Sequence, residues 1–321
     1  MIGASAGGVA ALLELVAGLP KAMDAVIGIV LHVGSRHSIL PQLLERRGAL
    51  PAVHPQHGQA LVPGTIYVAP PDHHMTFTED RALLGRGARE NHARPAIDPL
   101  FRSAALAWCD RAIGVVLTGD LDDGTAGLAA IKQCGGTAIV QDPVTAVAPS
   151  MPASALRNVS VDYTLAIGEI AATLVQLVGQ DAAAPAQPHP AQLQREQALF
   201  EGKHVMENLS AAGKPSGLSC PDCGGGLWEL NEAQPLRYRC HTGHAFTVGT
   251  LESAQTEQAE QALWSSVRAL QEREILLRRM AAVAEATGDP VQAQAGQRQA
   301  DRVRDQAHLL SRLVEGEMNS A

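Results

Sequence analysis

The sequence predicts an α/β fold: a doubly wound, mostly parallel sheet with helices on both faces, followed by a small cysteine-rich module and a helical hairpin. In residues 1–178, short apolar runs alternate with helical patterns, which is typical of a parallel sheet covered on both sides. Three of the five cysteines lie close together within residues 220–240, and residues 249–315 have the pattern of two long helices.

The predicted strands are continuous apolar runs, as expected of strands buried on both faces. Only Met1 and Ile2 precede the first turn, so the first strand is very short or lacks its start, and we expect a truncated or misassigned N-terminus. Further strands are predicted at 25–32, 65–70, 75–78, 112–119, 137–142 and 162–166. Helices are predicted at 8–15, 37–46, 99–108, 125–133 and 167–178.

Composition limits the functional classes. The 321 residues are 46% hydrophobic, enough for about two domains of roughly 150 residues each. The net charge is −8 and no basic stripe is present, which argues against nucleic acid as a partner. The N-terminal residues do not show a basic n-region followed by an apolar h-region, and no apolar run reaches the roughly 20 residues that span a bilayer. We therefore expect a cytoplasmic protein without membrane insertion.

The chain divides into four parts by composition and pattern. Residues 179–195 are rich in Ala, Pro and Gln without an apolar period, which indicates a linker. This linker separates the α/β domain, residues 1–178, from the cysteine-rich module at 196–248. The helical hairpin occupies residues 249–321.

The turn of the hairpin lies in the stretch TGDPVQ. Gly288 can end one helix in the left-handed conformation, Asp289 can cap the next, and Pro290 suits its first position. Gln292 completes a capping-box pattern. The hairpin could dock on the module, self-associate or contact a helical receptor. Its apolar stripe comprises Leu263, Val267, Leu270, Leu277, Ala281, Ala284, Val303, Ala307, Leu310 and Val314.

The first turn, GASAG, could hold a nucleotide or a nucleophile. A dinucleotide site requires G-x-G-x-x-G and an acidic residue after the second strand, but Ser5 replaces the middle glycine and the second strand ends at His32. Gly3 to Gly7 instead match G-x-S-x-G, whose small residues allow a strained turn that exposes a serine hydroxyl. This pattern favours a nucleophile.

Three strand ends supply the groups of a catalytic triad. Ser5 follows the first strand, His32 ends the second, and Asp120, Asp122 and Asp123 follow the strand at 112–119. Carboxyl ends of parallel strands meet at one edge of a sheet. A serine becomes nucleophilic when an imidazole takes its proton, and a carboxylate orients that imidazole. Taken singly, Ser5 could be a turn former, His32 could simply be hydrogen-bonded at a strand end, and the aspartates could belong to a solvated loop or a helix cap.

The cysteine-rich module has the spacing of a zinc site. C-x-x-C at Cys220 and Cys223 is followed by Cys240 and His244, and zinc prefers four such ligands in a tetrahedron. We expect a closed, structural, zinc-ribbon-like site around a hairpin at 224–239, and no cofactor for catalysis. His241 competes for the fourth ligand position, and a reduced cysteine cluster without metal is the alternative.

Six stretches resemble the catalytic domain of CheB, the bacterial chemotaxis protein-glutamate methylesterase: IGASAGG, LHVGSRHS, IYVAPPDHHM, RPAIDPLFRSAA, VVLTGDLDDGTAG and AIVQDPVTAVAPSMPASA. The resemblance implies hydrolysis of glutamate γ-methyl esters on chemoreceptors, with release of methanol, and often deamidation of glutamine. It implies that Ser5 is the nucleophile, His32 the general base and Asp123 the orienting acid. A similar CPDCGG…WEL…RCxxGH tail in some CheB-like proteins supports pairing Cys240 with His244.

The sequence also departs from the family pattern T-G-M-G-x-D-G. Asp120 stands where methionine is usual and Leu121 where glycine is usual, so an extra carboxylate is expected beside the substrate. Arg94 is expected to line the substrate cleft or to brace its loop. These departures leave open a weak or inactive homologue that acts as a binding module. The best-known members carry a receiver domain over the active site, so we expect this chain to be constitutively accessible or controlled by a partner or its C-terminal region.

Overall fold

The computed structural model describes residues 1–33, 37–180, 190–231 and 233–318. The chain forms two compact units, Met1–Leu251 and Glu252–Ala321. The first unit contains the predicted α/β domain together with the cysteine-rich module.

A seven-stranded sheet forms the centre of the first unit, and every pair of neighbouring strands in it is parallel. This confirms the predicted fold class. Strand β1 lies between β2 and β8, so the chain extends the sheet first to one side of β1 and later to the other. Such a reversal leaves a crevice at the carboxyl ends of the strands. In spatial order the strands are β10 (Tyr163–Leu165), β9 (Thr137–Gln141), β8 (Ile113–Val116), β1 (Ile2–Ala4), β2 (Ile27–Leu31), β5 (Ile66–Val68) and β3 (Ala52–Val53).

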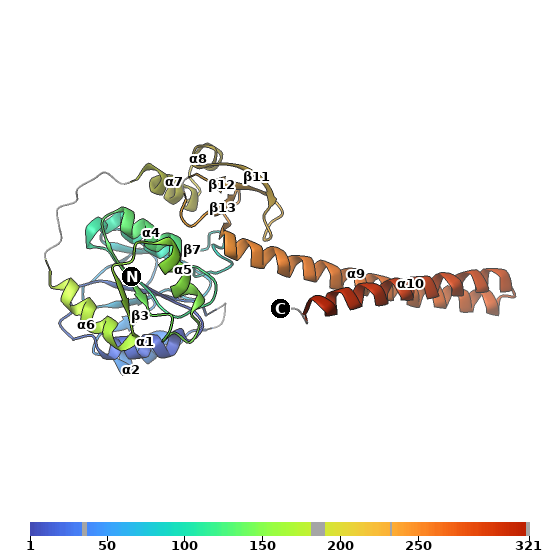
Figure 1. Cartoon of the computed structure of the whole chain (residues 1–321), viewed down its shortest axis with the longest axis horizontal. Coiled ribbons are helices and arrows are strands. Elements are labelled where there is room, and N and C mark those ends of the chain that lie inside the picture. The colour runs from blue at the N-terminus through green and yellow to red at the C-terminus, as the bar shows by residue number, and fades with distance from the viewer. Residues whose placement is uncertain (34–36, 181–189, 232, 319–321) are drawn as a thin grey trace. The chain divides into compact units, whose positions relative to one another are not determined.

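Helices cover both faces of this sheet (Figure 1). Alternate strand residues enter two separate cores: Ile29 and Leu31 pack on one face and Val30 on the other. This alternation explains why the strands are apolar throughout. The first face carries α1 (Gly8–Ala17), α2 (Leu40–Arg47) and α6 (Ile167–Val178); the second carries α3 (Ile97–Trp108), α4 (Thr125–Gln133) and α5 (Ser150–Asn158).

Several features of the first unit differ from the prediction, among them helix α5, strand β6, and helix α7, which begins within the predicted linker. Helix α5 was not predicted, because Pro149 and Pro152 suggest a break. Both prolines lie at the start of the helix, where backbone N–H groups have no partner within the helix. The strand predicted at 75–78 lies outside the parallel sheet: β6 (His74–Phe77) pairs with β7 (Arg81–Gly85), which pairs with β4 (Gln59–Ala60), in a separate antiparallel sheet. A single 3-10 turn, η1 (Cys109–Arg111), follows α3.

The cysteine-rich module is a four-stranded antiparallel sheet, and β12 and β13 form the predicted hairpin. Its small core joins Cys220 and Cys240 with Leu227, Phe246 and Leu251. Helices α7 (Ala191–Phe200) and α8 (Val205–Ala212) precede it. The sheet comprises β11 (Gly213–Ser219), β12 (Gly226–Leu230), β13 (Arg237–Cys240) and β14 (Ala245–Thr247).

The second unit holds the predicted helical hairpin, formed by α9 (Val248–Ala286), which begins in the first unit, and α10 (Pro290–Met318). Gly288 has a φ of 80°, and the carboxylate of Asp289 accepts a hydrogen bond from the amide of Gln292 (3.0 Å), as the TGDPVQ pattern predicts. Among the described helices, none has the length and apolar character needed to cross a membrane. The boundaries of the four predicted parts stay a prediction, and most of the predicted linker lies outside the described residues.

Candidate active site

Ser5 lies in the turn between β1 and α1, at the carboxyl edge of the sheet. Its amide donates a hydrogen bond to the carbonyl of Thr118, which follows β8 (3.0 Å). Gly7 has a φ of 75°, a conformation that favours glycine, and lets the chain turn into the helix. Gly119 must be small, since a Cβ there would lie 2.8 Å from the Cβ of Ser5. The neighbouring strand end therefore fixes the position of the serine.

His32 contacts both Ser5 and Asp123, although β1, which precedes Ser5, lies between the strands that precede the other two residues. Its Nε2 is 2.8 Å from Oδ2 of Asp123, and its Nδ1 is 3.2 Å from Oγ of Ser5. Because an ionised carboxylate only accepts hydrogen bonds, Nε2 carries the proton and Nδ1 is free to accept the serine hydroxyl. The arrangement is that of a nucleophile, a base and an orienting acid.

Asp123 is 2% exposed and accepts hydrogen bonds from several groups besides His32. The amide of Ile97 donates to Oδ2 (2.6 Å), and the amide of Gly124 and Nδ2 of Asn91 donate to Oδ1 (3.0 and 2.9 Å). Burial alone would raise the pKa of Asp123, but the hydrogen bonds and the nearby imidazole lower it below its ordinary value. The carboxylate thus stays ionised beside His32.

Asn91 and Asp98 are buried beside Asp123. The sequence analysis did not single out Asn91, and it gave Asp98 no role of its own beyond its place in the family-like stretch RPAIDPLFRSAA. Nδ2 of Asn91 also donates to Oδ2 of Asp98 (2.9 Å). Burial and the charge of Asp123 raise the pKa of Asp98 to about 8. Of these two adjacent carboxyl groups, Asp98 therefore takes up a proton more readily, and the negative charge is favoured on Asp123. No spacing pattern marks Asn91, because it lies in an irregular loop.

A cavity of about 430 Å³ adjoins His32 and is bordered by Asn91 and Arg94. Arg94 is also paired with Asp72 (2.7 Å) and donates to the carbonyl of Gly87 (2.7 Å), so it lines the cavity and braces the loop at once. Asp120 is exposed after β8 and is not among the residues that border this cavity. The structure thus brings Ser5, His32 and Asp123 together, with Arg94 near them.

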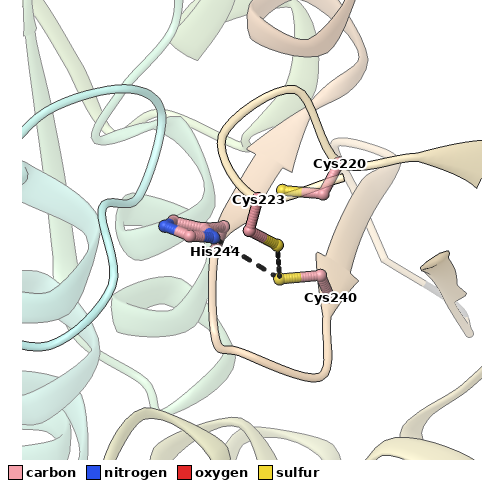
Figure 2. Close-up of side chains that lie close together, drawn as sticks. All are labelled: Cys220, Cys223, Cys240 and His244. Carbon is pink, nitrogen blue, oxygen red and sulfur yellow. Dashed lines mark hydrogen bonds between the residues drawn. The ribbon is translucent and has the colours of Figure 1, made fainter. Parts of the chain in front are cut away.

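The predicted metal ligands also come together. One ligand atom each from Cys220, Cys223, Cys240 and His244 lies within 4.8 Å of the others, as Figure 2 shows. The Sγ atoms of Cys223 and Cys240 are 3.7 Å apart, and Nδ1 of His244 is 3.5 Å from Sγ of Cys240. Sulfur ligands at about 2.3 Å from a tetrahedral zinc ion lie about 3.8 Å apart. The group therefore fits a metal ion, with His244 rather than His241 as the fourth member.

The chain is an α/β protein in which a serine, a histidine and an aspartate lie in contact as they do in serine hydrolases. The sequence profile of the CheB methylesterase family matches residues 1–174, and the chain belongs to this family. This confirms the resemblance noted in the sequence.

Relatives match the same part of the chain. A protein-glutamate methylesterase/protein-glutamine glutaminase of Caulobacter vibrioides is 38% identical over 53% of this chain and 51% of its own length. A relative from Leptospira interrogans is 38% identical over 55% of this chain and 93% of its own length. The crystal structure of the Thermotoga maritima CheB methylesterase catalytic domain superposes with a TM-score of 0.53 at 32% identity, covering 55% of this chain and 96% of that domain. This chain spans about half the length of the Caulobacter protein.

Proposed function

We propose that this chain hydrolyses glutamate γ-methyl esters on the cytoplasmic part of a chemoreceptor-type protein, releasing methanol, and that it deamidates glutamine at similar sites. The observation that carries this proposal is the contact of His32 with both Ser5 and Asp123 in a chain of the CheB methylesterase family. Residues 1–178 would form the catalytic domain, with the linker at 179–195, the zinc-ribbon-like module at 196–248 and the helical hairpin at 249–321.

The reaction proceeds by covalent catalysis. Nδ1 of His32 takes the hydroxyl proton while Oγ of Ser5 attacks the ester carbonyl, and Asp123 stabilises the imidazolium that forms. His32 then returns the proton to the methoxy group, and methanol leaves. Water, activated by the same imidazole, hydrolyses the glutamyl ester of Ser5 and regenerates the enzyme.

The start of α1 supplies stabilisation for the oxyanion. Within the described part of the chain, the amide N–H groups of Ala6 and Gly7 have no acceptor. In the G-x-S-x-G turn, the amide after the nucleophile is one of the usual oxyanion donors. Ala6 therefore binds the developing negative charge, and Arg94 lines the cavity through which the substrate side chain approaches.

We further propose that Cys220, Cys223, Cys240 and His244 hold one structural zinc ion. Among the described residues, the core cluster that contains these ligands has five buried members, and two of them are ligands, so packing alone gives this part of the module little stability. Zinc would add stability to the module and supply no catalytic step.

Methanol release from a methylated receptor cytoplasmic fragment tests the catalytic proposal. The intact protein should release methanol, Ser5→Ala should release none above background, and Asp123→Asn should lose about 10⁴-fold in kcat. Ser216→Ala, which removes a hydroxyl in the module, serves as the matched control and should retain full activity. An intact, folded protein that releases no methanol from a demonstrably methylated substrate would refute the assignment and favour a binding module.

A further inference from the structure

The loop that carries Asn91 is continuous with the sheet of the cysteine-rich module. Glu90 forms a parallel bridge with Ala245 of β14, and the amide of Asn91 donates to the carbonyl of Ala245 (2.8 Å). Asn91 itself has a φ of 50°, a left-handed conformation that asparagine tolerates better than most residues. The loop beside the active site therefore extends the edge of the module's sheet.

The side chain of Asn91 joins the catalytic carboxylate to the module. An asparagine amide can donate two hydrogen bonds and accept two. Nδ2 of Asn91 donates to Asp98 and to Asp123. Its Oδ1 accepts from the amide of Thr247 and from the hydroxyl of Thr250, each at 3.1 Å. All four positions are used, so the carboxylates and the threonines together fix both the place and the orientation of the amide.

A second contact reaches the loop that contains Asp123. Oγ1 of Thr247 donates to Oδ2 of Asp122 (2.6 Å). Asp122 is the immediate neighbour of Asp123. The module thus contacts the catalytic acid through a side-chain amide on one side and through the adjoining residue on the other.

Buried charges anchor the module to the α/β domain at the same place. Glu90 is 2% exposed and pairs with Arg102 of α3 and Arg239 of β13 (2.8 and 2.5 Å). The predicted metal-binding residues lie close to this contact. Oδ1 of Asp222 is 3.3 Å from Nδ1 of His92, and Oδ2 of Asp222 is 3.8 Å from Nε2 of His244, one of the predicted ligands. Folding of the cysteine-rich module and placement of the Asn91 loop are therefore physically connected.

We infer that Asn91 is a positioning residue for Asp123, and that Thr250, in the first turn of α9 directly after the cysteine-rich module, holds Asn91 in place. The module then acts as a structural part of the active site and not only as an appended domain. The inference rests on the proposed function for its kinetic consequence, but the position of the Asp123 carboxylate can be followed without turnover.

Thr250→Val and Thr250→Ser test this inference in the full-length, metal-loaded protein. Valine keeps the shape of threonine but removes the hydroxyl that donates a hydrogen bond to Oδ1 of Asn91. Asp123 should then be misplaced, and kcat/KM should fall about 10- to 100-fold. The pH profile of kcat/KM should also differ from that of the intact protein, because the carboxylate of Asp123 is no longer held in the same place beside the imidazole. Serine keeps the hydroxyl and should restore most of the rate.

A readout without turnover separates this inference from the proposed function. The downfield NMR resonance of the His32 Nε2 proton, donated to Asp123, should move in Thr250→Val and return in Thr250→Ser. Zinc content should stay at one ion per chain in both variants. If the intact protein shows no methylesterase activity but the resonance shifts as expected, the function fails and the positioning role stands. An unchanged resonance together with an unchanged pH profile overturns the positioning role.

A double-mutant cycle with Asn91→Ala covers the case in which Thr250→Val loosens the module. If Thr250 acts through Asn91, the double variant should be no worse than Asn91→Ala alone. Effects that multiply would mean that Thr250 acts by another route, and would overturn the inference.

Discussion

Glu90 carries the charge on which docking of the module depends. Burial alone would raise its pKa, but Arg102 and Arg239 hold the pKa well below its ordinary value of 4.5. A carboxylate with a lowered pKa in the folded state stabilises the fold fully above its unfolded value. That contribution is lost as the pH falls below about 4.5 towards the folded value.

Glu90→Gln should therefore lower the free energy of unfolding at pH 7 by about 3–5 kcal/mol, because it leaves two buried guanidinium groups without a counter-charge. It should also flatten the loss of stability between about pH 5 and pH 3. Urea unfolding at pH 7 and pH 4 measures both effects. Asp80→Asn is the matched control, since its pair with Arg81 is exposed and its loss should change little. If Glu90→Gln lost stability on acidification as steeply as the intact protein does, the assigned role of Glu90 would be contradicted.

The same residues show what the sequence can reveal about the site. Ser5, His32 and Asp123 could be predicted because each follows an apolar strand, and strand ends of a parallel sheet share an edge. Asn91 could not, because it lies in an irregular loop and its partners, Thr247 and Thr250, are more than 150 residues away in the chain. Nothing local in the sequence indicates that these residues meet.

Among the elements, we expect the Cys220–Cys223 turn and the hairpin of β12 and β13 to depend on the proposed zinc ion more than on packing. Cys240→Ser should lose most of its bound zinc and melt at a lower temperature, because one ligand of the tetrahedron is gone. Atomic emission gives the stoichiometry and a thermal melt gives the stability. Cys134→Ser changes a half-buried thiol at the end of α4 and should keep one zinc ion per chain. Full zinc content in Cys240→Ser would exclude the proposed ligand set.

Helices and strands were predicted well where the apolar residues follow one clear pattern along the chain, and poorly elsewhere. The strands of the parallel sheet are apolar on both faces, and the hairpin of α9 and α10 has caps at its turn. Helix α5 starts with prolines that a helix interior would not tolerate, and β6 has no sequence feature that assigns it to a second sheet. Assignment to a sheet depends on which distant strands lie nearby, and a local pattern does not carry that information.

At the scale of the whole molecule, the contacts that hold Asp123, the proposed orienting acid, end where the first compact unit ends. Thr247, Thr250 and Leu251 belong to that unit, and the second unit begins at Glu252. The second unit has its own small interior, which includes Val267, Ala281 and Val303. None of the hydrogen bonds of Asp123 or Asn91 described above involves a residue of the second unit.

Removal of residues 263–321 should therefore leave the catalytic centre intact. We expect kcat for methanol release to stay within about two-fold of the full chain, since the groups around Ser5 are unchanged. Zinc content should remain at one ion per chain, because all four ligands lie before the cut. Kinetics of the truncated chain on the methylated receptor fragment, with metal analysis, test this. A change confined to KM would indicate that the helical hairpin contacts the protein substrate, whereas a large fall in kcat at full zinc content would show that the hairpin supports the catalytic residues themselves.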